Sequence, residues 1–144
     1  MKINLQKYLK KGNLQPHRTS EKEIESFKKL IARDLSDCGI EELSVDRRFA
    51  TAYQAAFNLS RIVISASGYR VSAKTGHHAL TFEIAGLLLG ERFKEYFDYF
   101  DVCRRKRNIV DYDLTDVTSI SELKELLEKV QEFRQIVYNW LKKE

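Results

Sequence analysis

The sequence contains few of the residues that interrupt helices. Its 144 residues include one proline, Pro16, and six glycines. Proline clashes with the preceding helical turn, and glycine in a helix interior costs about 1 kcal/mol relative to alanine. Runs of β-branched residues that alternate with polar ones are also missing, which leaves strands with little support. The composition therefore predicts an all-α protein.

Cysteine is equally scarce, and its spacing excludes two kinds of structure. The two cysteines, Cys38 and Cys103, lie far apart in the chain. They have neither a disulfide framework nor the ligand spacing of a zinc site. Both fall on apolar helix faces, so we interpret them as small buried side chains in a reducing, cytoplasmic environment. The sequence predicts no metal site and no other cofactor.

No hydrophobic run is long enough to cross a membrane. The longest, Ile84–Leu89, falls far short of the ~20 apolar residues that a bilayer requires. The lysines near the N-terminus are not followed by an apolar segment, so we do not expect a signal peptide. Apolar residues still make up 43% of the chain, which is typical of a globular domain. We therefore expect no membrane partner.

Five segments place apolar residues at the spacing of a helix, all within residues 20–144. Ser20 with Glu23, and Ser119 with Glu122, have the spacing of a capping box, which marks the start of a helix. Helices of this length joined by short loops pack as antiparallel neighbours. We predict a single domain, an antiparallel up-down bundle of four to five helices. The predicted helices cover residues 20–38, 45–67, 76–89, 91–110 and 119 to nearly the end of the chain.

Outside these helices we expect an arm and a loop. Residues 1–19 hold five lysines and arginines and no acidic residue, in a chain with a net charge of +4. They are predicted to form a basic N-terminal arm with one short helical turn at residues 5–9. Its lysines either contact phosphates or only solvate the surface. Residues 69–75 are predicted to form a connecting loop, and the helix at 76–89, apolar nearly all round, is expected in the centre of the bundle.

The helix at 91–110 carries the feature most relevant to function. Phe93, Phe97 and Phe100 form its apolar stripe, and the next positions on the same face are Arg104 and Arg107. A purely structural helix would place leucine or alanine there. Because burying an arginine without a partner is costly, these two side chains predict an anionic or dipolar partner.

The residues themselves leave two interpretations of this arginine pair. In the first, Arg104 and Arg107 pair with Asp111, with Asp113 or with a carboxylate of another helix, and only brace the bundle. In the second, the pair faces a groove and holds a phosphate by forked hydrogen bonds. Asn108 lies four residues from Arg104, on the same side of the helix.

Three motifs of the central region recur together in one family. The alanine-rich helix ends in Ile64-Ser65-Ala66-Ser67-Gly68-Tyr69-Arg70, and Gly76-His77-His78 follows. The third motif is Cys103-Arg104-Arg105-Lys106-Arg107-Asn108-Ile109-Val110-Asp111-Tyr112. With these motifs, the segment from Tyr53 to Asp113 resembles the HEPN superfamily of small helical-bundle proteins.

The resemblance implies a class of functions. Many HEPN proteins are metal-independent ribonucleases of toxin–antitoxin or defence systems, often paired with a small nucleotidyltransferase. Others bind RNA or nucleotides without cutting. The family commonly forms homodimers in which two copies of the catalytic signature meet in one cleft. It therefore implies an RNA or nucleotide ligand, a homodimer, and a nucleotidyltransferase or antitoxin as partner.

The ribonuclease members of the family carry an arginine followed a few residues later by a histidine. Arg107 matches the arginine and Asn108 the polar residue that often follows it, but Tyr112 stands at the histidine position. Tyrosine, with an ordinary pKa of about 10, is a poor base at neutral pH. We therefore expect phosphate binding by Arg104, Arg107 and Asn108 rather than cleavage by the family mechanism.

Two alternatives stay open. His77 and His78 begin the helix at 76–89, where anions are favoured, and one of them could replace the missing base if the preceding loop folds over the arginines. The protein would then be a metal-independent ribonuclease that uses Arg107 with His77, His78 or Tyr112. In the other alternative it is a non-catalytic scaffold for protein interactions, and the histidines only cap a helix. His17 stands alone in the arm and has no predicted role.

Overall fold

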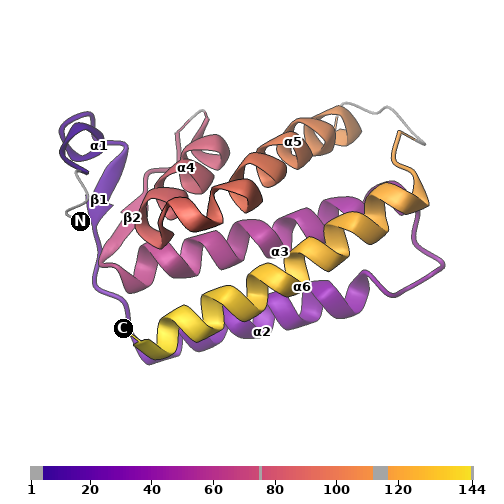
Figure 1. Cartoon of the computed structure of the whole chain (residues 1–144), viewed down its shortest axis with the longest axis horizontal. Coiled ribbons are helices and arrows are strands. Elements are labelled where there is room, and N and C mark those ends of the chain that lie inside the picture. The colour runs from indigo at the N-terminus through magenta and orange to yellow at the C-terminus, as the bar shows by residue number, and fades with distance from the viewer. Residues whose placement is uncertain (1–4, 75, 112–116, 144) are drawn as a thin grey trace.

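A computed structural model describes residues 5–74, 76–111 and 117–143, without the side chains of residues 110 and 111 (Figure 1). Helices dominate it, which confirms the all-α class. Its elements, in chain order, are α1 (Gln6–Lys10), β1 (Leu14–Pro16), α2 (Glu21–Asp37), α3 (Val45–Ala66), β2 (Tyr69–Val71), α4 (His77–Leu89), the 3-10 turn η1 (Glu91–Phe93), α5 (Lys94–Asp111) and α6 (Ile120–Lys143). The five long helices follow the five predicted segments closely.

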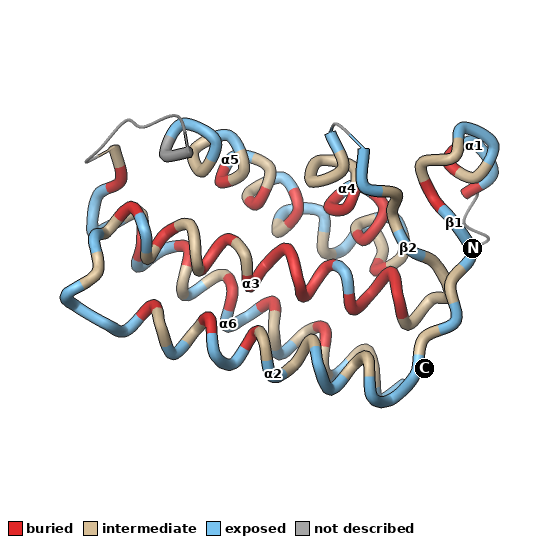
Figure 2. Tube along the Cα trace, turned by 180° about the vertical axis from the view of Figure 1, so that it is seen from behind, coloured by how far each residue is buried: buried red, intermediate tan, exposed pale blue. Residues whose placement is uncertain are grey.

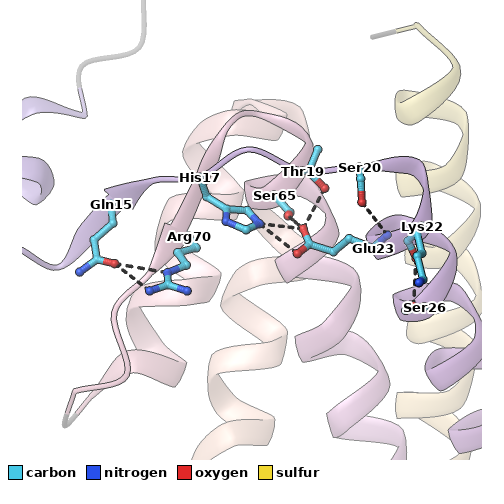
Figure 3. Close-up of polar contacts among 9 residues, drawn as sticks. All are labelled: Gln15, His17, Thr19, Ser20, Lys22, Glu23, Ser26, Ser65 and Arg70. Atoms are coloured by element: carbon cyan, nitrogen blue, oxygen red, sulfur yellow. Dashed lines mark hydrogen bonds and ion pairs between the residues drawn. The ribbon is translucent and has the colours of Figure 1, made fainter.

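The predicted capping residues begin their helices. At the start of α6 the box is complete, because the Ser119 hydroxyl accepts the Glu122 N–H at 3.1 Å and the Glu122 carboxylate accepts the Ser119 N–H at 2.9 Å. At the start of α2 the Ser20 hydroxyl accepts the Glu23 N–H at 3.1 Å. The Glu23 carboxylate points elsewhere, toward the N-terminal segment and α3 (Figure 3).

The bundle is built around α3. This helix contacts α2, α4, α5 and α6, with α4 and α5 on one side and α2 and α6 on the other (Figure 1). Ala52, Ala55 and Ala56 are fully buried, and their small side chains allow neighbouring helices to approach closely. Figure 2 shows buried residues along most of α3. The prediction that the helix at 76–89 occupies the centre was wrong, because α4 packs against one side of α3 and leaves Leu87 exposed.

The N-terminal segment is folded onto this bundle in its described part. β1 pairs antiparallel with β2, with Leu14 opposite Val71 and Pro16 opposite Tyr69. Leu5, Tyr8 and Leu14 are buried in the core, and α1 forms where one helical turn was predicted. The loop predicted at residues 69–75 therefore begins with a strand, because the N-terminal segment supplies the pairing partner that no local pattern reveals.

The remaining core agrees with the predicted stripes. Phe97 and Phe100 of α5 are buried, and Phe100 meets Phe133 of α6 with ring centroids 5.1 Å apart. Cys38 and Cys103 are buried free thiols, as predicted, and burial raises the pKa of each to about 11. At neutral pH both are therefore protonated and poorly nucleophilic. Within the described residues, no helix has the length and apolarity that a membrane span requires.

Candidate functional site

The predicted arginine pair lies on α5 beyond the buried phenylalanines, and both side chains are half-buried. The Nε of Arg104 donates to Oδ1 of Asp101 at 2.9 Å, and an Nη of Arg105 donates to Oδ2 of the same carboxylate at 3.0 Å. Among the described side chains, the partner of Arg104 is thus Asp101, one turn earlier on its own helix. One carboxylate serves two guanidinium groups.

Arg107 lies against the ring of a tyrosine from α3. Its guanidinium carbon is 5.7 Å from the centroid of Tyr53, within the range of a cation–π contact. The flat face of the ring fixes the guanidinium between α3 and α5. The exposed side chain of Asn108 is the next residue along the helix. Tyr112, Asp113 and the side chain of Asp111 lie outside the described residues, so their predicted roles stay predictions.

The structure brings one of the two predicted histidines to this position. The Tyr53 hydroxyl lies 2.9 Å from Nδ1 of His78, and the two rings are nearly parallel with centroids 5.9 Å apart. The His78 ring also stacks on Phe57, with centroids 4.0 Å apart. His78 therefore contacts two aromatic residues of α3, one of which is the tyrosine that contacts Arg107.

The surroundings keep both members of this pair uncharged at neutral pH. Burial lowers the pKa of His78 to about 4, with further lowering by His77, Arg107, Arg104 and Arg61. Burial also raises the pKa of the Tyr53 hydroxyl, although Arg107 and Arg104 oppose this shift. Arginines from α3 and α5 therefore act on the same imidazole, and the site has a positive potential.

His77 begins α4 but points differently. Its Nδ1 lies 3.0 Å from the carbonyl oxygen of Lys74, and its ring meets that of His78 edge-on at 4.6 Å. The N-cap of α4 is Gly76, whose φ of 83° is a left-handed conformation that glycine adopts without strain. Of the two histidines, His78 is the one that contacts the tyrosine next to Arg107.

A second polar cluster, around Glu23, involves residues that had no predicted functional role. The Glu23 carboxylate accepts hydrogen bonds from Thr19 at 2.8 Å and from Ser65 of α3, and it lies 2.9 and 3.0 Å from Nε2 of His17 (Figure 3). Burial would raise the pKa of Glu23, but the hydrogen bonds from Ser65, His17 and Thr19 outweigh it and lower the pKa to about 2. Glu23 therefore joins the N-terminal segment to both α2 and α3.

Beside this cluster lies a pocket of about 520 Å³, which we call the Arg61–Arg70 pocket. It is lined by β1, α2, α3, β2 with the residues that follow it, and the start of α4. Phe57 and His77 line the pocket and also contact His78, so the pocket adjoins the Tyr53–His78 pair. No sequence motif marks it, because the β1–β2 pairing that helps to form it was not predicted.

The described residues contain no group of three or more His, Cys, Asp or Glu side chains able to hold a metal ion. What they offer chemically is a set of guanidinium groups beside neutral imidazole and phenol groups. Such a set can bind an anion by forked, charge-assisted hydrogen bonds. Comparison of the chain with known families, curated proteins and solved structures gives no match.

Proposed function

We propose that this helical bundle binds RNA or nucleotide phosphates through Arg104 and Arg107, with Asn108 beside them, and that it acts in a toxin–antitoxin or defence-type system. The supporting observation is that Arg107, on the same face of α5 as Arg104, lies over the ring of Tyr53, whose hydroxyl is 2.9 Å from Nδ1 of His78. Because this half-buried imidazole is neutral at neutral pH, the positive charge that an anionic ligand meets here comes from the arginines alone. The system assignment rests on the resemblance to the HEPN superfamily.

The charge balance of α5 favours ligand binding over bracing. Asp101 carries one negative charge and contacts two guanidinium groups, so it neutralises at most one of them. The side chain of Arg104 is 23% exposed, which leaves part of it open to a ligand. A brace would instead pair each guanidinium with its own buried carboxylate.

Binding of a fluorescent single-stranded RNA, followed by anisotropy across a salt series, tests this function. We expect affinity to fall steeply with salt, because each phosphate contact releases counterions. Arg104→Gln and Arg107→Gln should each weaken binding by about tenfold. Each should also reduce the slope of log K against log salt concentration by about 0.7 for the phosphate contact that is lost. Lys124→Gln, which removes an equal charge from an exposed position of α6, is the matched control. An equal loss in the control, or binding that ignores salt, would contradict the proposal.

Folding of the variants is checked by circular dichroism and thermal melting. Arg107 is half-buried, so Arg107→Lys serves as a second variant that keeps the charge and most of the stem. A lysine has no planar fork, and at a bidentate phosphate site it should still weaken RNA binding. If Arg107→Lys binds RNA as tightly as the wild type does, Arg107 does not hold a phosphate by a forked contact.

Ribonuclease activity is the second candidate function, and the position of His78 favours it. The imidazole lies beside the arginine that matches the family signature, and it is unprotonated at neutral pH. With a pKa of about 4 it is a weak base, and its Nδ1 already faces the Tyr53 hydroxyl, so we infer binding rather than cleavage. RNA cleavage in EDTA that disappears in both Arg107→Ala and His77→Ala/His78→Ala would reverse this choice.

The proposal includes a homodimer, and a nucleotidyltransferase or antitoxin as partner, from the same resemblance. A groove of about 990 Å³ between α4 and α5 could receive the second copy, and since Arg104 and Arg105 line one part of it, the partner would lie next to the arginine site. It exposes Leu87 and Val102, and both acidic and basic side chains line it, which suits contact between identical surfaces. Sedimentation velocity of the wild type and of Leu87→Asp tests this, and we expect only the variant to be monomeric. A scaffold without ligand is the remaining alternative, and loss of stability without loss of RNA affinity in Arg104→Ala would support it.

A further inference from the structure

The Arg61–Arg70 pocket has one wall whose hydrogen bonds are already formed. The Glu23 carboxylate on this wall receives contacts from His17, Thr19 and Ser65, as Figure 3 shows. These hydrogen bonds occupy most of its acceptor positions and fix the shape of this wall. Glu23 stays ionised at neutral pH, so its single negative charge lies in the pocket beside the charges of the arginines.

Two of the other polar side chains of the pocket, Arg61 and Arg70, are cationic. Arg61 donates to the side-chain oxygen of Asn58 at 3.3 Å, and Arg70 donates to that of Gln15 at 3.2 and 3.3 Å. Both acceptors are neutral amides, and the ion pairs among the described residues include neither arginine. Two guanidinium groups thus face one pocket without a carboxylate of their own.

Arg61 is held in place by aromatic rings. Its guanidinium carbon lies 4.9 Å from the ring centroid of Phe27 and 5.9 Å from that of Phe57. Arg61 is exposed overall, but these rings cover part of its guanidinium, and this desolvation lowers the pKa of Arg61, although Glu23 opposes the shift. A partly desolvated cation gains more from an anionic ligand than a fully hydrated one does.

The remaining lining gives the ligand its size and character. Phe27, Phe57, Ile64 and Val71 supply apolar surface, and Ser72 and Thr81 supply hydroxyl groups. The volume of about 520 Å³ lies in the range of sites for small organic ligands and is much larger than an inorganic anion needs. Two guanidinium groups can donate to the three terminal oxygens of a phosphate monoester, one more oxygen than a carboxylate offers.

We propose that this pocket binds a small organic phosphate monoester of about the size of a nucleotide or sugar phosphate, with Arg61 and Arg70 as its phosphate ligands and Phe27 and Phe57 beside its organic part. The proposal does not depend on RNA binding by Arg104 and Arg107, because the pocket uses different arginines. It gives the protein a small-molecule site next to the Tyr53–His78 pair.

The test is a titration of ¹⁵N-labelled protein, followed by NMR, with AMP, ribose 5-phosphate, adenosine and inorganic phosphate. We expect saturable shifts of the Arg61 and Arg70 side-chain N–H signals with AMP or ribose 5-phosphate, and none with adenosine. Arg61→Gln and Arg70→Gln should each weaken this binding by at least about tenfold. Arg47→Gln removes an equal charge from an exposed position at the start of α3 and should leave it unchanged.

The other outcomes separate this site from the RNA site. Arg104→Gln should weaken RNA binding but leave the phosphate titration unchanged, and Arg70→Gln should do the reverse. Arg61→Lys, which keeps the charge and the stem, guards against a folding defect in Arg61→Gln and should restore part of the binding. Absence of saturable shifts up to about 10 mM ligand, which corresponds to a binding free energy weaker than about −3 kcal/mol, would overturn the proposal. So would equal shifts in the wild type and both glutamine variants, or equal binding of adenosine.

Discussion

The Tyr53 hydroxyl and Nδ1 of His78 lie 2.9 Å apart, with both rings uncharged at neutral pH. Because Tyr53 keeps its proton, its hydroxyl can donate to Nδ1 when the imidazole carries its own proton on Nε2. This contact ties α4 to α3 at the place where Arg107 meets Tyr53. The geometry of the arginine site therefore depends on His78 remaining neutral.

Acid should weaken this contact before it affects most of the core. The pKa of His78 falls from 6.5 in the unfolded chain to about 4 in the fold, so the unfolded state binds more protons between these values. The stabilisation is complete above pH 6.5 and is lost as the pH falls through about 4. We expect the free energy of unfolding to drop by about 2 kcal/mol over this range, after allowance for solvent screening.

Chemical denaturation at a series of pH values measures this drop, and ¹⁵N NMR of the imidazole gives the pKa directly. In His78→Asn, where the side-chain oxygen can take the place of Nδ1, the stability change between pH 6.5 and 4 should be much smaller than in the wild type. A measured His78 pKa near 6.5 would contradict the buried, positively surrounded site.

Glu23 should control stability at lower pH. Its pKa is lowered to about 2, so the stability that it provides is complete above pH 4.5 and is lost as the pH falls through about 2. Glu23→Gln removes the charge but keeps the shape, and we expect it to cost about 1 kcal/mol at pH 7 and to reduce the acid dependence below pH 4.5. Ser65→Ala, which deletes one of the donors, should act in the same direction.

The same change should loosen the N-terminal segment. His17 lies in the segment that follows β1, and Glu23 is its partner on α2. In Glu23→Gln we expect faster amide exchange at His17 and Ser72, whose N–H groups hydrogen-bond to carbonyl oxygens across the β1–β2 pair. Lys22→Gln, one residue away and exposed, is the control. Equal exchange in the two variants would show that Glu23 does not hold the sheet.

Much of the fold follows from local signals, and this explains why it could be predicted. The helices begin at Ser20, Ser44 and Ser119, whose hydroxyls accept a backbone N–H of the first turn, and such caps are readable from a few residues. The β1–β2 pair could not be read in the same way. It joins Leu14 to Val71 across all of α2 and α3, and three-residue strands carry too little periodicity to predict their partner.

The candidate site also contains residues that local patterns predict and residues that only the tertiary fold brings together. Arg104 and Arg107 were predicted because they continue a phenylalanine stripe, and their spacing on one helix is a local property. His17, Glu23 and Ser65 meet only after β1 has paired with β2 and α2 has packed on α3. Glu23 was read as half of a capping box, and the structure uses its carboxylate for a contact 42 residues away instead.

Asp34 should destabilise the folded protein at neutral pH. It is buried on α2, its Oδ2 has no hydrogen-bond partner among the described residues, and its ion pair with Arg33 is long at 3.6 Å. Burial raises its pKa, so the fold is penalised as the pH rises above 3.8 and through the raised value. We expect Asp34→Asn to increase the free energy of unfolding by about 1 kcal/mol at pH 7, with a gain that disappears near pH 3. Denaturant titrations of Asp34→Asn and the wild type at the two pH values measure this gain. A loss of stability at pH 7 would mean that the ion pair with Arg33 contributes more than the burial of Asp34 costs.

Asp101 should limit the affinity of the arginine site for phosphates. Its two oxygens accept from Arg104 and Arg105 at 2.9 and 3.0 Å, and a phosphate must compete with it for these donors. Asp101→Asn keeps a hydrogen-bond acceptor but removes the negative charge. We expect it to tighten RNA binding several-fold at low salt and to leave the fold intact, since Asp101 is partly exposed and surface ion pairs contribute at most about 1 kcal/mol. Asp98→Asn, one turn earlier and paired with Lys94, removes the same charge away from Arg104 and should have a smaller effect. If both variants tighten binding equally, general charge rather than the Arg104 contact sets the affinity. If Asp101→Asn weakens it, the carboxylate positions Arg104 for the ligand instead of competing with it.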